Sequence, residues 1–250
     1  MPGRVRDTVH HPLFARLFTR LSAAAEERGQ AEHRRENLAG LSGRVIEVGA
    51  GHGLNFKAYP GSVREVLAVE PEGYLRSLAE EAAKQAPVKI RVVDGVADRL
   101  PADSDSFDAA VASLVMCSVP DQDAAFAEVG RVLRPGGELR FYEHVVSERA
   151  RLARMQRALD RLGIWPLVAG GCHASRDTRA AIERSGLEIE SCRSFRFRRG
   201  LPELITAPKI LGVARRGQPR RSGRDEAPRR QSTPAPSSSS EAATISAMQL

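Results

Sequence analysis

Residues 44–53 read RVIEVGAGHG, and this short stretch decides how the rest of the chain is interpreted. The apolar run RVIEV is typical of a buried strand. GAGHG follows directly, and the missing side chains at Gly49 and Gly51 let the backbone approach a ligand closely. Gly53 allows a helix expected from Leu54 to pack against the strand. The stretch therefore predicts a ligand-binding turn at the end of a strand.

Two neighbours of this turn narrow the class of ligand. A dinucleotide fold uses G-x-G-x-x-G, which requires glycine at position 54, and Leu54 stands there. The carboxylate of Glu47, just before the turn, would repel a pyrophosphate but would attract a cationic ammonium group. A nicotinamide oxidoreductase is therefore disfavoured, and the turn favours a zwitterionic ligand.

The alternation of strand and helix continues along the chain. Strand-like runs occupy residues 44–48, 65–70, 88–93, 107–113, 137–145, 187–197 and 209–214. Helical stretches are expected at 12–38, from Leu54, at 74–85, at 123–133 and at 175–185. Such alternation predicts right-handed crossovers and a mostly parallel sheet. The predicted fold class is α/β: a Rossmann-like, doubly wound, seven-stranded sheet with an antiparallel C-terminal strand and helices on both faces.

Length and charge indicate one main domain with an extension at each end. The chain has 250 residues, which suffices for one substantial core. We expect an N-terminal helical extension at 1–42 and a main domain at 43–214, which carries a lid or substrate insertion at 147–174. A disordered, basic, Pro/Ser-rich tail is expected at 215–250. Seven arginines against three acids give this tail +4 of the formal net charge of +7, so the body offers no strong case for nucleic acid.

Targeting and cysteine patterns indicate a cytoplasmic protein with reduced cysteines. No run approaches the roughly 20 apolar residues of a membrane helix, and the first residues contain no secretory apolar core. A cytoplasmic protein is therefore expected. Cys117, Cys172 and Cys192 are odd in number, far apart and without a C-x-x-C pair. They predict reduced thiols, with neither a disulfide framework nor a zinc site, and no metal is expected.

A second acid follows the second strand. Glu70, with Pro71 after it, lies about twenty residues past the glycine turn, where a carboxylate can accept hydrogen bonds from both hydroxyls of a ribose. The alternative is a solvated loop acid. Together with the glycine turn, Glu70 favours ribose binding.

These residues resemble the class I S-adenosylmethionine-dependent methyltransferases. In that family an acid precedes G-x-G-x-G and the second strand ends in an acid, as with Glu47 and Glu70 here. The resemblance covers about 43–214, and residues 94–121 and 128–141 look like the later motifs of the family. It implies S-adenosylmethionine as the methyl donor, released as S-adenosylhomocysteine, and a small-molecule acceptor.

The resemblance also implies a set of cofactor-binding residues. They are Glu47, Gly49, Ala50, Gly51, Gly53, Glu70, Pro71, Ala97, Asp98, Ser113 and Leu114. Ala97 and Asp98 would lie beside the adenine, while Ser113 and Leu114 would line the cleft beneath the reacting methyl. Val96 replaces the acid that the family usually has there, so the contact to the adenine amino group would pass to Asp98.

Four segments are similar to the thiol S-methyltransferases of the methyltransferase-like group. They are NFKAYP at 55–60, LVMCSV at 114–119, FYEHV at 141–145 and GGCHASRDT at 170–178. They imply a thiol acceptor, with oxygen, nitrogen and carbon nucleophiles kept open. Those proteins begin with an apolar membrane anchor that is not seen here, so a membrane-bound lifestyle is not implied. A noncatalytic cofactor-binding or interaction module is the alternative from another class.

His144 is the candidate catalytic residue. It follows the fifth strand on the cofactor side, where it could accept the proton of the nucleophile or orient it; the alternative is a histidine bonded to structural backbone. Glu143 points to the other face and is expected to have a structural partner. Cys117 and Cys172 are interpreted as buried packing residues.

A strongly basic helix is expected at 147–162, with leucines and a methionine along one face. We interpret it as a lid over a substrate pocket; peripheral contact with acidic lipid is the alternative. His173 and Arg176, which follow a Gly-Gly turn, fit a helix cap, a lid contact or an anion site.

Overall fold

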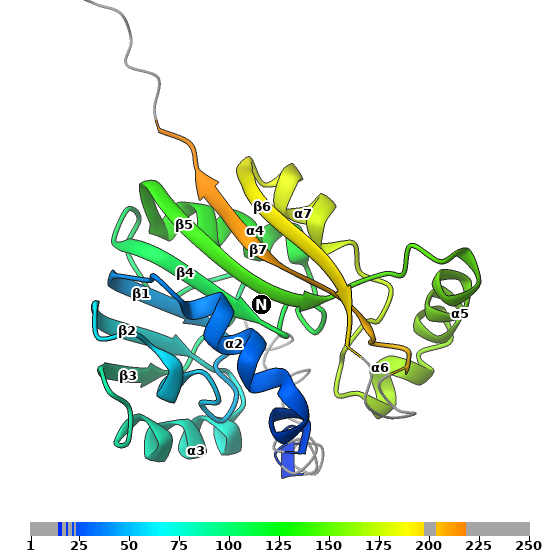
Figure 1. Cartoon of the computed structure of the whole chain (residues 1–250), viewed down its shortest axis with the longest axis horizontal. Helices are drawn as coiled ribbons and strands as arrows, with labels where there is room; N and C mark the ends of the chain where they lie inside the picture. The colour runs from blue at the N-terminus through cyan, green and yellow to red at the C-terminus, as the bar shows by residue number, and fades with distance from the viewer. Residues whose placement is uncertain (1–14, 17–18, 20–21, 23, 198–203, 219–250) are drawn as a thin grey trace, which may run out of the picture. The chain divides into compact units, whose positions relative to one another are not determined.

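The computed structural model describes residues 15–16, 19, 22, 24–197 and 204–218, which form a seven-stranded sheet covered by helices (Figure 1). The strands are β1 (Gly43–Val48), β2 (Val63–Val69), β3 (Lys89–Val93), β4 (Phe107–Ser113), β5 (Leu133–His144), β6 (Leu187–Arg196) and β7 (Pro208–Arg216). Their order across the sheet is β3-β2-β1-β4-β5-β7-β6. Neighbours are parallel from β3 to β5, and only β7 runs antiparallel, to both β5 and β6. The predicted fold class is confirmed.

The strand order reverses between β1 and β4. The chain first builds outward from β1 through β2 to β3, and then returns to place β4 on the other side of β1. The connections that follow β1 and β4 therefore leave the ends of these strands toward opposite sides, which opens a crevice at the carboxyl ends of the two strands. The glycine turn lies at this switch point, because it begins directly after Val48.

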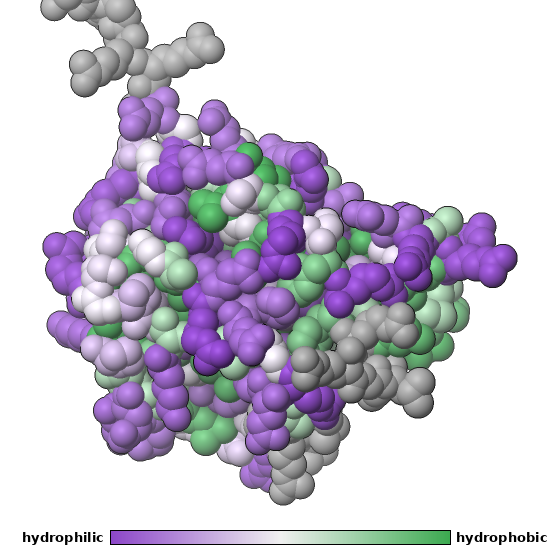
Figure 2. Space-filling view, in the orientation of Figure 1, coloured by the Kyte–Doolittle hydropathy of each residue, from purple (hydrophilic) through white to green (hydrophobic). Residues whose placement is uncertain are grey.

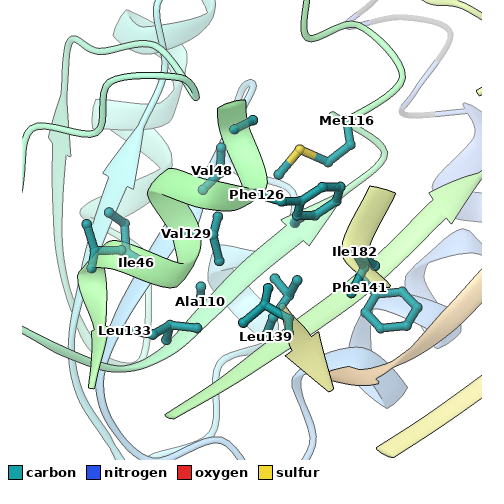
Figure 3. Packing of buried hydrophobic residues seen from close by; sticks show 14 of the residues in the cluster. Ile46, Val48, Ala110, Met116, Phe126, Val129, Leu133, Leu139, Phe141 and Ile182 are labelled. Atoms are coloured by element: carbon teal, nitrogen blue, oxygen red, sulfur yellow. The ribbon is translucent and has the colours of Figure 1, made fainter. Parts of the chain in front are cut away.

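Alternate residues of the central strands feed two separate apolar layers. Ile46, Val48 and Ala110 face the layer that contains Phe126 of α4, as Figure 3 shows. Their neighbours in the sequence face the opposite layer, against residues of α2 and α3. Both faces of the central strands are thus buried, which explains why these strands read as continuous apolar runs.

The helices agree with the prediction in place, except that the one expected after β1 is absent from the described residues and α6 was not predicted. They are α2 (Ala31–Leu38), α3 (Gly73–Ala83), α4 (Gln122–Val132), α5 (Ala150–Arg161), α6 (Ile164–Val168) and α7 (Thr178–Arg184). The side chains of Glu72, Asp121 and Asp177 accept backbone N–H groups at the starts of α3, α4 and α7. These caps set where the helices begin.

The helix predicted from Leu54 is wrong. Turns follow the glycines, and then a single 3-10 turn, η2 (Phe56–Ala58). Pro60 disfavours a helical conformation for the residue before it, and Tyr59 is accordingly extended, with φ −64° and ψ 129°. The chain thus returns quickly to β2.

The C-terminal end of the main domain differs from its predicted boundary, whereas the N-terminal helix ends at Leu38 as expected. At the N-terminal end, a π-helical turn, η1 (Glu26–Gln30), with Gly29 at φ 113° leads into α2. Residues 1–14 of the predicted extension lie outside the described residues, and so do residues 219–250 of the predicted tail. Strand β7 continues to Arg216, which pairs with Leu187, so the first residues assigned to that tail belong to the sheet. Among the helices of the described residues, none combines the length and the apolar composition needed to cross a bilayer.

Candidate active site

The glycine turn is tied to the end of β2. The backbone N–H groups of Gly49 and Ala50 both donate to the carbonyl oxygen of Val69, at 2.9 and 3.0 Å. Gly49, Gly51 and Gly53 have φ values of 66°, 57° and 83°, which side chains with a Cβ rarely adopt. The turn therefore needs glycine for its own conformation as well as for close approach of a ligand.

Glu70 lies against this turn. Its carboxylate accepts hydrogen bonds from the backbone N–H groups of Gly51 at 2.7 Å and Glu72 at 2.9 Å. Burial raises the pKa of Glu70 above its ordinary value, although these two hydrogen bonds act in the opposite direction. A carboxylate has about four lone-pair sites, so Glu70 can accept further hydrogen bonds from a diol. Pro71 follows it and leads into α3.

Glu47 lies in a buried polar network. Its carboxylate accepts from Asn55 Nδ2 at 2.9 Å and from the Tyr59 hydroxyl at 2.7 Å. Only 2% of Glu47 is exposed, and this burial raises its pKa to about 7. The predicted contact between Glu47 and an ammonium group would thus extend a network that already holds both carboxylate oxygens.

Helix α2 supplies two residues that sequence reasoning missed. Arg34 donates from Nη1 to Asn55 Oδ1 at 3.1 Å, and it also pairs with Glu26. Asn37 Nδ2 lies 3.4 Å from Ser113 Oγ, and its Oδ1 is buried without a hydrogen-bond partner within the described part of the chain. Both side chains are almost fully buried, and because burial is a property of the fold, no pattern in the sequence indicated them.

Ser113 and Leu114 end β4 beside the glycine turn. Asn55 Nδ2 donates to Ser113 Oγ at 3.2 Å, which joins Ser113 to the network of Glu47. Leu114 has φ 58°, a conformation that is costly for a branched side chain and that concentrates at functional sites. A Cβ added at Gly49 would lie 2.1 Å from Val115 Cγ2, so the two turns pack directly on each other.

Ala97 and Asp98 lie in a turn after β3. An isolated bridge between Val96 and Arg99 closes this turn. Ala97 packs against the apolar layer of α4, and Asp98 is half-buried. Their predicted contact with an adenine stays a prediction.

His144 is brought together with two cysteines. It is the last residue of β5, and its Nε2 lies 3.4 Å from Cys172 Sγ. Cys117 joins them from the turn after β4, with the three ligand atoms all within 4.8 Å of one another. Burial raises the pKa of the Cys117 thiol well above its ordinary value. Cys117 is buried, as expected, and its role stays a prediction.

Glu143 has structural partners, as expected. One carboxylate oxygen accepts from the backbone N–H groups of Val115 and Met116, at 3.1 and 3.2 Å. This side chain holds the turn after β4 against β5. Arg176, whose role was left open, donates from Nη2 to the carbonyl oxygens of Val119 and Pro120. It thus joins the loop before α7 to the same region.

Helices α5 and α6 follow β5, where a lid was predicted. The basic helix begins at Ala150, three residues later than expected, and buries Ala153 and Gln156. Apolar residues remain exposed where α5 meets α6, among them Leu162 at 71% and Leu167 at 84%. Figure 2 shows apolar surface in this region, at the right of the view. The lid and the lipid contact both stay predictions.

Comparison with known proteins agrees with this geometry. The methyltransferase domain family matches residues 46–141. A thiol S-methyltransferase of Mus musculus is 37% identical over 185 residues, which cover 70% of this chain and 74% of the relative. The chain belongs to the class I S-adenosylmethionine-dependent methyltransferases.

Two further likenesses are consistent with this family. A thiol S-methyltransferase of Homo sapiens is 38% identical over 159 residues, which cover 60% of this chain but only 63% of the relative. The structure of an S-adenosylmethionine-dependent methyltransferase from Mesorhizobium loti superposes with a TM-score of 0.57 at 23% identity, covering 75% of this chain and 99% of that one. The solved structure supports the fold, and the relatives support the family.

The residues at the switch point of this methyltransferase fit S-adenosylmethionine. The glycine turn and the carboxylate of Glu70 meet at the carboxyl ends of β1 and β2, where a nucleoside is expected in such sheets. The buried, unpartnered Oδ1 of Asn37 and the carboxylate of Glu47 belong to one network with Ser113, and both are acceptors suited to an ammonium group. The hydrogen-bond acceptors that suit the cofactor thus lie along the same edge of the sheet as the glycine turn, whose backbone a ligand can approach.

Proposed function

We propose that this protein transfers the methyl group of S-adenosylmethionine to the sulfur of a small thiol. The observation that carries the proposal is the similarity to thiol S-methyltransferases over most of the described chain. The segments around Cys117, His144 and Cys172, which suggested this group, meet at the carboxyl end of β5. Their convergence supports an acceptor site beside the proposed donor site.

Eleven residues are proposed to bind the donor. Glu47 and the turn hold its amino-acid part, Glu70 binds the ribose, and Asp98 reaches the adenine. The full set is Glu47, Gly49, Ala50, Gly51, Gly53, Glu70, Pro71, Ala97, Asp98, Ser113 and Leu114. Arg34 and Asn37 are added by the structure, because they complete the buried network.

The chemistry asks the protein mainly for alignment. The sulfonium of the donor supplies an activated methyl group and a good leaving group, so holding the acceptor in line and excluding water provides most of the acceleration. A thiol with an ordinary pKa near about 8.5 is already a few per cent thiolate at neutral pH. His144 is proposed to contact the acceptor sulfur, either by accepting its proton or by orienting it. The lid formed by α5 and α6 is proposed to shield this contact from water.

A panel of acceptors tests the proposal. The protein is incubated with S-adenosylmethionine and with small thiols, phenols, amines or quinones, and the release of S-adenosylhomocysteine is measured. Thiols are expected to support release and the matched alcohols are not. Release with phenols, amines or quinones but with no thiol would overturn the thiol acceptor and leave the family unaffected. Failure to bind the donor in calorimetry would remove the enzymatic function altogether and favour an interaction module.

A further inference from the structure

Cys117, His144 and Cys172 form a buried group of metal-binding side chains. Their ligand atoms all lie within 4.8 Å of one another, and Cys172 Sγ is 3.4 Å from His144 Nε2. Ligand atoms at about 2.0–2.3 Å from a tetrahedral zinc ion are about 3.5–3.8 Å apart. The three atoms are therefore close to the spacing that one ion imposes, and small side-chain rotations would complete it.

We propose that these three side chains bind one Zn²⁺ ion and leave its fourth position open for the sulfur of the acceptor. The role of the fourth position rests on the proposed function, whereas the ion site does not. Two thiolates and one imidazole are the ligand types that select zinc over the harder magnesium and calcium ions. Two thiolates also cancel the charge of the ion, which a buried site requires.

Backbone hydrogen bonds tie together the three segments that carry the ligands. The carboxylate of Glu143, the residue before His144 in β5, accepts from the backbone N–H groups of Val115 and Met116, just before Cys117 in the turn after β4. The N–H of His173, in the loop before α7, donates to the Cys117 carbonyl at 2.9 Å. Residues next to each ligand in the sequence are thus hydrogen-bonded to the segment of another ligand. Such outer contacts hold the ligands of a metal site in position.

The loop that carries Cys172 has a further anchor. The carboxylate of Asp160 on α5 accepts from the backbone N–H groups of Ala174 and Ser175, at 3.1 and 2.8 Å. The other ring nitrogen of His144, Nδ1, is buried without a hydrogen-bond partner within the described residues. It is placed to donate to a water or to the acceptor when Nε2 holds the ion.

An ion with an open position explains how a thiol would be activated. A thiol that binds as the fourth ligand releases its proton to solvent and stays as a thiolate. Its sulfur then forms a bond to the methyl carbon while the carbon–sulfur bond of the sulfonium breaks, and the bonding pair remains on S-adenosylhomocysteine. The product is a neutral thioether, a weaker ligand than a thiolate, so it can leave the ion.

Cobalt binding to the full-length, reduced and chelator-treated protein tests the site. Co²⁺ is expected to bind with one-to-one stoichiometry, to give thiolate-to-cobalt charge-transfer absorption, and to be displaced by Zn²⁺. Cys117→Ser and Cys172→Ser should each weaken zinc binding at least about tenfold, because changes to mere outer contacts of a zinc site already cost that much. Cys192→Ser is the matched control, since Cys192 lies on β6 outside the group. Circular dichroism confirms that each variant is folded.

Alkylation of the unaltered protein gives an answer that does not depend on any variant. Zn²⁺ should slow the reaction of Cys117 and Cys172 with iodoacetamide, read peptide by peptide, and leave Cys192 unchanged. Absence of charge-transfer absorption, equal protection of all three cysteines, or equal weakening by Cys192→Ser would overturn the ion site. Thiol methylation that persists in the metal-free protein would likewise overturn the ion as activator while the proposed function stands. Zinc binding without methylation of any thiol would instead leave the ion site and remove the proposed function.

Discussion

The proposed donor end and the proposed acceptor end of this methyltransferase are assembled in different ways. At the proposed donor end, Glu47 lies near the end of one strand, and the glycine turn and Glu70 follow two adjacent parallel strands, so they lie within one local unit. At the proposed acceptor end, Cys117, His144 and Cys172 come from three segments separated by helices and loops. Residues of a local unit are close in the sequence and can be recognised as a motif. Residues of a site assembled from distant segments appear in the sequence as isolated positions.

The same contrast appears in how the two ends are held. Donor residues are bonded to backbone that the sheet itself orders, as when Gly49 and Ala50 donate to Val69. The acceptor end depends on side chains that join loops, such as Glu143 and Asp160. Changes at the donor end should therefore abolish cofactor binding, and changes at the acceptor end should affect the acceptor alone.

The largest effect is expected from Gly51→Arg. Gly51 has φ 57°, where a residue with a Cβ is strained by about 1–2 kcal/mol, and the arginine would also fill the donor site. Donor affinity measured by calorimetry should fall at least about a hundredfold, or about 2.7 kcal/mol. Gly61→Arg is the matched control, because nothing lies within 4 Å of a Cβ there. Equal affinities of the two variants would mean that the turn does not hold the donor.

The next effect concerns the pH dependence of folding. Glu47 has its pKa raised from 4.5 to about 7 by burial, with Tyr59, Asn55 and Arg34 lowering it and Glu70 raising it. The stability contributed by its protonated form is complete below about pH 4.5 and is lost as the pH rises through 7. Between pH 5 and pH 8 this amounts to about 2.5 kcal/mol in the free energy of unfolding.

Denaturant titrations at pH 5 and pH 8 measure this effect. The wild-type chain should lose stability relative to Glu47→Gln over that interval, since glutamine has no proton to lose. Groups common to both chains cancel in the difference. The free energies of unfolding of the wild type and of Glu47→Gln could instead differ by the same amount at pH 5 and at pH 8. Glu47 would then be ionised at both pH values and better solvated than its position indicates.

A smaller effect is expected from Glu70→Gln. The substitution keeps the shape but replaces charged hydrogen bonds to the ribose, each typically about 1.5–3 kcal/mol, with neutral ones. Donor affinity should fall about tenfold, which is about 1.4 kcal/mol. Glu65→Gln on β2, the strand that Glu70 follows, is the control, because Glu65 pairs with Arg44. If both variants bind the donor as the wild type does, Glu70 serves only the backbone of the turn.

The smallest effect is expected from Asp160→Ala, and it should separate the two ends. Loss of the hydrogen bonds to Ala174 and Ser175 loosens the loop that carries Cys172. Misplacement of acceptor-side groups by a fraction of an ångström should raise the acceptor KM about fivefold. The donor Kd should stay within about twofold, and Asp123→Ala, which alters an exposed side chain on α4, should change neither. A parallel loss of donor affinity would mean that the two ends are not independent.

Much of the fold could be predicted because strand and helix patterns are local. The seven strands and the antiparallel strand at the C-terminal end were predicted from apolar runs, and the sheet has them in that form. The helix predicted after Gly53 is wrong, because Pro60 and the buried amide of Asn55 decide that segment and leave only a 3-10 turn. Arg34 and Asn37 were missed for a related reason: a polar residue on a helix reads as solvent-exposed until its tertiary partners are known.

The sequence by itself determined the proposed donor half of this methyltransferase. One acid near the end of the first strand, three glycines after it and a second acid after the next strand form this half, and parallel pairing leaves little freedom in how the strand ends meet. Only the tertiary structure decided the proposed acceptor half, where Cys117, His144 and Cys172 become neighbours. The physical reason is that side-chain proximity across loops depends on the packing of the whole sheet and its helices, and sequence spacing carries no record of it. Spacing alone indicated no metal site, whereas the folded chain brings together three ligands suited to one.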